Sequence, residues 1–214
     1  MSDINFPHTA RILNRCAEIA TEPNMKAAVV SAHNDVLEPH ADPYLVKHKA
    51  VVRAATAFAK ENAESIKALN ALDAPYLTAR AAIAARLPET VLPGTLKTRP
   101  TDTDKIDAIE DLIDLIDDHV GTAWADELLA GDFGTKAPTT VREIRERIAA
   151  DKNLSTAQNE RAAAFGATYT ALLAFKRVVR AALGSKSKQY RRIHQRASAA
   201  EAEEDEVTEP TNPT

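Results

Sequence analysis

Alanine is the residue that most constrains how this chain can fold, because about 40 of its 214 residues are alanine. Alanine has the highest intrinsic helix propensity, and its small side chain lets helices approach closely. The 6 glycines and 11 prolines fall mostly between long stretches whose apolar residues recur at intervals of three and four. The sequence therefore predicts an all-α protein, an antiparallel up-down helical bundle of about four long helices with short additional helices.

The domain organisation follows from length and from the distribution of proline and charge. With 44% hydrophobic residues the chain can bury one substantial core, so we expect one helical-bundle domain over residues 1–197. A connector at about residues 88–100, with three prolines and Gly94, separates two helical halves. Residues 198–214 are acidic and almost without large apolar groups, and we expect them to form a disordered tail.

Proline and turn-forming residues place the expected breaks between helices. We predict a turn over residues 38–43, a break at 73–75 and a loop over 131–138. Two capping-box patterns, in which a glutamate or glutamine follows a serine or threonine by three residues, predict separate helices beginning at Thr140 and Ser155. Gly184 is expected to end the second of these helices.

The most regular helix of the sequence begins at Thr101, Asp102 or Thr103, each of which is a suitable N-cap residue. Its apolar residues alternate strictly in steps of three and four and predict one buried stripe. The stripe consists of Ile106, Ile109, Ile113, Ile116 and Val120.

The same helix carries an unusual row of carboxylates at intervals of four, three and four. This aspartate row consists of Asp107, Asp111, Asp114 and Asp118. Like charges at these spacings repel each other, and aspartate is a poor helix former. The row is either a solvated face balanced by the chain's own cations, such as Lys176, Arg177 and Arg180, or a docking face for a basic protein partner. A Mg²⁺ or Ca²⁺ site is less favoured, because a straight row cannot wrap an ion.

A basic segment follows Gly184 and is interleaved with Tyr190 and His194. It consists of Lys186, Lys188, Arg191, Arg192 and Arg196. Cations around an aromatic ring can grip phosphates while the ring stacks on a base. The acidic run over residues 201–206 follows at once and can neutralise these cations in cis. We therefore favour a solvated helix packed on the bundle and disfavour nucleic acid as a partner.

Three histidines near the first expected turn are the alternative metal ligands: His33, His40 and His48. Imidazole binds zinc, nickel and cobalt, but the spacing matches no established zinc signature, and turns collect such residues for backbone reasons. A di-iron bundle requires Glu-x-x-His on two helices, and the chain has no such motif.

Motifs for catalysis are also missing from the sequence, which has no P-loop, no Gly-x-Gly-x-x-Gly and no Gly-x-Ser-x-Gly. The single Cys16 lies on an apolar helical stripe and is expected to be a core residue. The sequence predicts a non-catalytic protein without a cofactor, which presents helical faces to a protein partner or to itself as a homo-oligomer. The alternative is a metal- or small-ligand-binding bundle. The absence of a signal sequence and of a long apolar run predicts a protein without membrane insertion, and the single Cys16, which cannot form an internal disulfide, predicts a cytoplasmic location.

Overall fold

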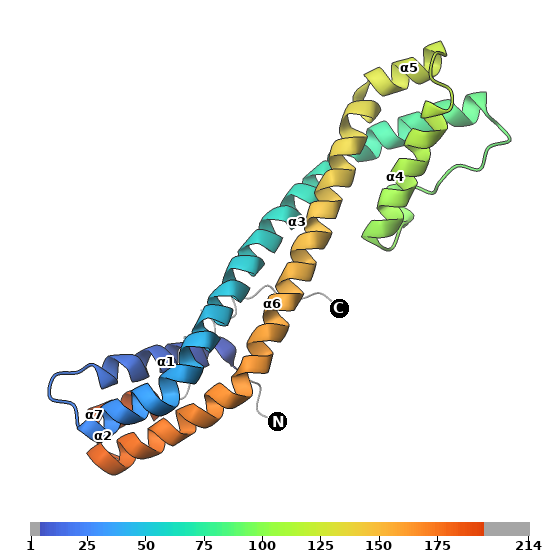
Figure 1. Cartoon of the computed structure of the whole chain (residues 1–214). Coiled ribbons are helices and arrows are strands. Elements are labelled where there is room, and N and C mark those ends of the chain that lie inside the picture. Colours follow the sequence, from blue (N-terminus) through green and yellow to red (C-terminus); the bar gives the residue numbers. More distant parts are fainter. Residues whose placement is uncertain (1–4, 195–214) are drawn as a thin grey trace. The chain divides into compact units, whose positions relative to one another are not determined.

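The computed structural model describes residues 5–194, and every regular element in that range is a helix, which confirms the all-α prediction. The predicted tail over residues 198–214 lies outside the described residues. In chain order the elements are α1 (Phe6–Ala20), α2 (Ala27–Ala32), the π-helix η1 (His33–Leu37), α3 (Glu38–Arg86), the 3₁₀ turn η2 (Leu96–Thr98), α4 (Asp102–Asp117), α5 (Ala123–Ala130), α6 (Asp132–Leu183) and α7 (Lys188–His194) (Figure 1). Two helices, α3 and α6, are much longer than the others.

The turn expected at residues 38–43 and the break expected at 73–75 are both wrong. Instead, α2, η1 and α3 follow one another without a gap. The π-helix ends at Leu37, two residues before Pro39, and its wider turn gives room for a proline ring that would clash with the carbonyl one turn earlier in a regular helix. Pro75 lies between the fully buried Leu72 and Tyr76, so tertiary burial holds the helix together across the proline.

The loop expected over residues 131–138 is helical, and the separate helix starts expected at Thr140 and Ser155 are wrong. Apart from Gly131, which caps α5, all of these positions lie inside α6, and that helix contains Pro138 in its second turn. No further proline follows before the helix ends at Leu183, so nothing in the sequence interrupts the helix. The Thr140 hydroxyl is buried and donates to the carbonyl of Lys136, at 2.9 Å, rather than capping a helix.

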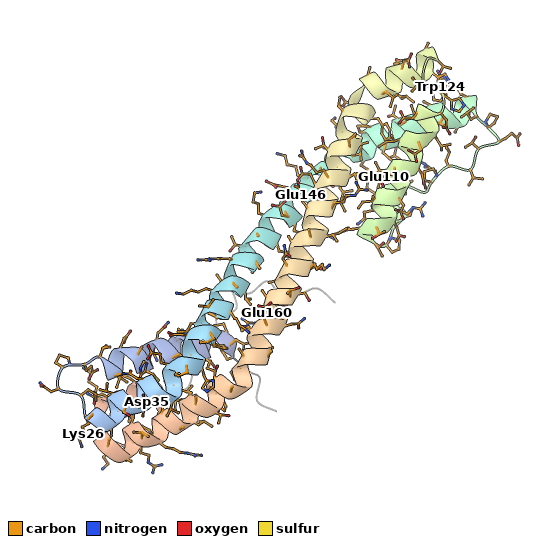
Figure 2. All side chains as sticks on the ribbon, viewed as in Figure 1. Lys26, Asp35, Glu110, Trp124, Glu146 and Glu160 are labelled. Atoms are coloured by element: carbon orange, nitrogen blue, oxygen red, sulfur yellow. The ribbon has the colours of Figure 1, made fainter. Side chains whose placement is uncertain are left out.

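The chain forms two compact units, and the division between them falls within α3 and within α6. Unit 1 contains residues 5–56 and 153–194 of the described chain. Its core is aromatic as well as aliphatic, and Phe175, Tyr44 and Cys16 are fully buried in it. Cys16 is therefore a core residue, as predicted. Figure 2 shows the side chains of this unit around α1, α2 and α7.

Unit 2 contains residues 57–152, including the whole segment 88–100 that was expected to separate two helical halves. Its core gathers residues from α3, α4, α5 and α6, with Tyr76, Ile109, Leu112 and Ile116 fully buried. The prediction of one domain over residues 1–197 stays a prediction.

Most of the buried stripe predicted for α4 is confirmed, and its end is corrected. Ile106, Ile109 and Ile116 are buried as expected, but Ile113 is only partly buried and Leu112 is fully buried in its place. Val120 is 62% exposed, because α4 ends at Asp117 and Val120 lies in the turn that follows.

Two predicted helix caps are confirmed: the Thr101 N-cap of α4 and the glycine that ends α6. At the start of α4 the Thr101 hydroxyl accepts from the Asp104 amide, and the Asp104 carboxylate accepts from the Thr101 amide, both at 3.1 Å. At the end of α6, Gly184 has a φ of 88°, a left-handed conformation that glycine adopts at little cost.

Candidate functional site

The aspartate row lies on the face of α4 that points away from the core of unit 2. All four of its side chains are exposed, whereas Ile109, Leu112 and Ile116 anchor the opposite face. The helix is also fixed at its start by the Thr101 cap. The row is thus a set of carboxylates on a firmly held helix.

None of the four carboxylates of the row forms an ion pair within residues 5–194. Neighbouring carboxylates of unit 2 do form such pairs: Glu110 on α4 (Figure 2) contacts Arg145 at 2.8 Å, and Asp102 pairs with Lys105 at 3.3 Å and with Arg147. The cations Lys176, Arg177 and Arg180, expected to balance the row, belong to unit 1. The row therefore differs from these neighbouring carboxylates of unit 2, which have cationic partners in the described chain.

A shallow groove of about 490 Å³ runs between the connector and α4. Asp111, Asp114 and Asp118 line it together with Arg99, Leu92 and Pro93. The Arg99 Nε is buried and has no hydrogen-bond partner within the described chain. The groove therefore places three carboxylates opposite one guanidinium and an apolar wall.

Tyr76 holds the connector against α4 beneath this groove. Its hydroxyl lies 2.9 Å from the Gly94 carbonyl oxygen and 3.2 Å from that of Ala108. Burial raises the pKa of Tyr76, and the negative charge of Asp111 acts in the same direction, whereas Arg80 and Arg99 lower it. Tyr76 thus stays protonated as a structural donor.

The basic segment is divided between internal and exposed cations. Arg192 pairs with Glu18 at 2.5 Å and with Glu22 at 2.8 Å, so it ties α7 to α1 and its C-terminal turn. Lys186, Lys188 and Arg191 are exposed. Arg196 lies outside the described residues.

The structure places the three candidate histidines in unit 1 but does not bring them together as a ligand set. His33 is buried and packs edge-on against Phe175, with ring centroids 6.0 Å apart. His48 stacks on Tyr44, and His40 is exposed. In the range 5–194, none of the three belongs to a group of three or more His, Cys, Asp or Glu whose ligand atoms lie within 4.8 Å of one another.

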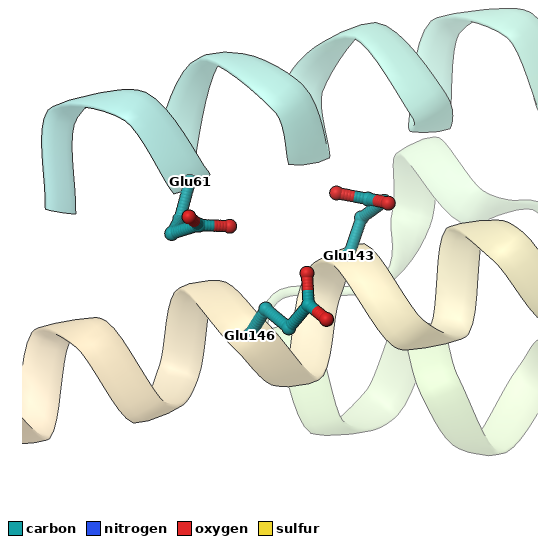
Figure 3. A group of neighbouring side chains, drawn as sticks. All are labelled: Glu61, Glu143 and Glu146. Atoms are coloured by element: carbon teal, nitrogen blue, oxygen red, sulfur yellow. The ribbon is translucent and has the colours of Figure 1, made fainter. Parts of the chain in front are cut away.

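Sequence reasoning missed one carboxylate group that does meet this distance. Glu61 of α3 and Glu143 and Glu146 of α6 point toward one another between the two helices (Figure 3). Lys60 contacts Glu61 at 3.0 Å, and Arg142 contacts Glu143 at 2.6 Å, so the group is balanced by cations of its own helices. The spacing of Glu143 and Glu146 is visible in the sequence, but their approach to Glu61 depends on how α3 and α6 pack.

A second groove of unit 2, of about 620 Å³, was also not predicted. Its walls include Trp124 and Phe133, with the Arg86 guanidinium 5.8 Å from the centroid of the tryptophan ring. Glu127 and Asp132 add carboxylates. The groove is thus lined by two aromatic side chains and by charges of both signs.

Nucleophilic chemistry at the single cysteine is disfavoured by its surroundings. Burial raises the pKa of Cys16 to about 12, and the nearby charge of Lys176 offsets this only in part. The thiol is therefore protonated and enclosed at neutral pH.

Surface charge distinguishes the two units more clearly than any single residue does. Among its described residues, unit 1 has 14 Lys and Arg against 6 Asp and Glu, whereas unit 2 has 12 against 18. The aspartate row belongs to the acidic unit.

Comparison with known proteins gives no family for this chain. No family model, curated protein or solved structure matches it. Over the described part of the chain, none of the helices combines the length and the apolar character that crossing a bilayer requires.

Proposed function

We propose that this protein is a non-catalytic interaction protein whose aspartate row binds a cationic surface on a protein partner. The observation that carries the proposal is that four carboxylates are exposed on a well-anchored helix and have no ion-pair partner in the described chain. Repulsion between the four carboxylates lowers the stability of the free helix. A partner that supplies cations relieves this repulsion on binding, and the relief adds to the binding free energy.

The expected partner surface is a helix with lysine or arginine at matching intervals. The row runs over twelve residues, from Asp107 to the C-cap Asp118, and its eleven steps correspond to about 16 Å of helix. Exposed ion pairs each contribute about 0.2 to 1 kcal/mol, so several must form together. Complementary charge of this kind chiefly governs the encounter rate and the register, and it weakens as salt rises.

A second copy of the chain is one such partner, because the described part of unit 1 carries a net positive charge and unit 2 a net negative one. The measurement is the solution mass at low and high salt. A mass above the monomer at low salt that falls to the monomer at high salt supports a homo-oligomer. A monomer at every salt concentration restricts the proposal to a different protein.

The docking proposal is tested with a synthetic helical peptide that carries lysine at positions one, five, eight and twelve. The isotope-labelled full chain is titrated with this peptide and with a matched peptide that carries glutamine instead. We expect amide shifts centred on residues 107–118 for the lysine peptide alone. Equal shifts with both peptides, or shifts centred elsewhere, would contradict the proposal.

The alternative is a protein that binds a metal or a small ligand. The groove at Trp124 favours a small ligand over a metal, since it is lined by both aromatic and charged side chains. Trp124 is the only tryptophan, so its fluorescence reports ligand entry directly. Stoichiometric metal in protein purified without a histidine tag would instead favour the metal-binding form. We propose a cytoplasmic location, in keeping with the free thiol of Cys16.

A further inference from the structure

The last turns of α6, the turn that follows it and the exposed side of α7 carry five cations that form a basic end of unit 1. This basic end consists of Arg177, Arg180, Lys186, Lys188 and Arg191, all of them exposed. Val179 of α6 and Ile193 of α7 are buried in one hydrophobic cluster, and Gly184 ends α6 four residues before α7 begins. Figure 1 shows where α6 and α7 lie in unit 1. The five charges therefore share one end of the unit.

The cations of the basic end are not used to hold the fold together. None of them forms an ion pair within residues 5–194, whereas neighbouring cations do have internal partners. Arg192 pairs with Glu18 and Glu22, and the Lys26 ammonium donates to the Ala182 carbonyl. The basic end thus remains a surface without counterions in the described chain.

The arrangement also carries an electrostatic cost. Arg177 and Arg180, and likewise Lys188 and Arg191, are three residues apart on one helix face, where like charges repel. An anionic occupant would relieve this repulsion.

We propose that the basic end is the docking surface for the acidic segment over residues 201–206 of the same chain. That segment has five carboxylates in six residues and follows α7 in the sequence. The described chain ends at His194, inside the basic end itself. The opposite charges are therefore joined by a short tether.

The tether is long enough for the contact. Residues 195–200 can span at most about 20 Å, and the helix from Arg177 to Leu183 covers about 9 Å. A short tether also gives an effective concentration in the millimolar range, so even a weak charge contact is populated. The docked segment shields the basic end from other anions. This inference does not depend on the proposed role of the aspartate row.

The experiment places a spin label beside the acidic segment through Val207→Cys in the otherwise unaltered, isotope-labelled full chain. The natural Cys16 is 0% exposed, so the label attaches to the introduced cysteine. The readout is the broadening of the amides of residues 176–181, which are distant from the label in sequence. We expect several-fold more broadening at low salt than at high salt.

Three variants with the same label separate docking from mere tethering. The first carries Glu203→Gln, Glu204→Gln, Asp205→Asn and Glu206→Gln, and we expect it to lose most of the broadening. The second carries Arg177→Gln and Arg180→Gln in the basic end and should also reduce the broadening. The third, its control, carries Lys49→Gln and Arg53→Gln, which remove exposed cations elsewhere in unit 1, and should leave the broadening unchanged.

Three results would overturn the inference. The first is equal broadening with the charged and the neutralised segment, which would mean that the tether alone brings the label close. The second is no broadening of residues 176–181 in the unaltered chain. The third is broadening that appears when spin-labelled chains are mixed with separate isotope-labelled chains, because the occupant would then be a second copy.

Discussion

The two units of this protein each bury an apolar core, but their surfaces carry opposite net charge. Each buries a cluster of apolar residues contributed by α3, α6 and shorter helices, yet the described part of unit 1 is basic and unit 2 is acidic. A core needs only apolar residues of suitable volume at helical spacing, so it leaves the outward positions unconstrained. Any difference in function between the two units must therefore come from their surfaces and not from their cores.

The two cores differ in the kind of side chain that fills them. Unit 1 relies on aromatic contacts, such as Phe6 against Phe165 with ring centroids 5.4 Å apart. Unit 2 relies on branched aliphatic residues of α4, with Ile109 and Ile116 fully buried. Substitutions of buried residues in each unit test whether both cores contribute to stability in this way.

The largest expected effect is in unit 1. Phe175 is 0% exposed and packs against His33, so Phe175→Ala should lower the free energy of unfolding by about 3 to 5 kcal/mol. Leu173→Ala on the same helix is the matched control, because Leu173 is 37% exposed and should cost far less. Urea denaturation measures both. Equal losses would mean that the aromatic core is not closely packed.

In unit 2 the corresponding change is Ile109→Ala. It should lower the free energy of unfolding by about 2 to 4 kcal/mol, because Ile109 is fully buried against α3 and α6 residues. Ile113→Ala should cost less, and Val120→Ala should stay within about 0.5 kcal/mol. If chemical denaturation gave the reverse order, the buried face of α4 would be assigned incorrectly.

A smaller effect is expected for the hydroxyl that joins the connector to α4. Tyr76→Phe removes the donor to the Gly94 and Ala108 carbonyls and should cost about 1 to 2 kcal/mol. Tyr190→Phe in unit 1 serves as the control, since the Tyr190 hydroxyl forms no hydrogen bond with any residue from 5 to 194. Thermal melting should show a loss of stability for Tyr76→Phe but not for Tyr190→Phe. Equal losses for the two variants would mean that the Tyr76 hydroxyl contributes no specific stability.

The smallest effect concerns the acidic surface alone. Asp111→Asn with Asp114→Asn relieves repulsion along α4 and should raise the free energy of unfolding by a few tenths of a kcal/mol. The change should be visible at low salt and vanish at high salt, because screening already removes the repulsion. A clear loss of stability would show that the two carboxylates have a structural partner.

Much of the fold is visible in the sequence, and the reasons for the exceptions are physical. Periodicity alone identifies Ile106, Ile109 and Ile116 as buried, and local chemistry alone identifies the Thr101 cap. Proline was misleading at Pro39, Pro75 and Pro138, because tertiary burial and a π-helix outweigh a local preference that is worth a few kcal/mol.

The candidate site divides in the same way. The exposure of Asp107, Asp111, Asp114 and Asp118 follows from the spacing of the buried residues on α4, so the sequence suffices. The groove beside Arg99 does not follow from it, because the path of the connector depends on the Tyr76 hydroxyl. The approach of Glu61 to Glu143 is likewise a property of helix packing, which no local pattern encodes.

The most direct test of the account is the affinity of the lysine-bearing helical peptide for three chains at low and high salt. The chains are the unaltered protein, the variant with Asp111→Asn and Asp114→Asn, and a control with Glu89→Gln and Asp151→Asn, which removes two exposed charges of unit 2 outside the row. At low salt we predict that the peptide binds the variant with Asp111→Asn and Asp114→Asn about three- to tenfold more weakly than the unaltered protein, and that it binds the control with near-normal affinity. The affinity should depend less on salt for the Asp111 and Asp114 variant, and as usual for the control. Equal affinities of the two variants would contradict the claim that the aspartate row is a docking face.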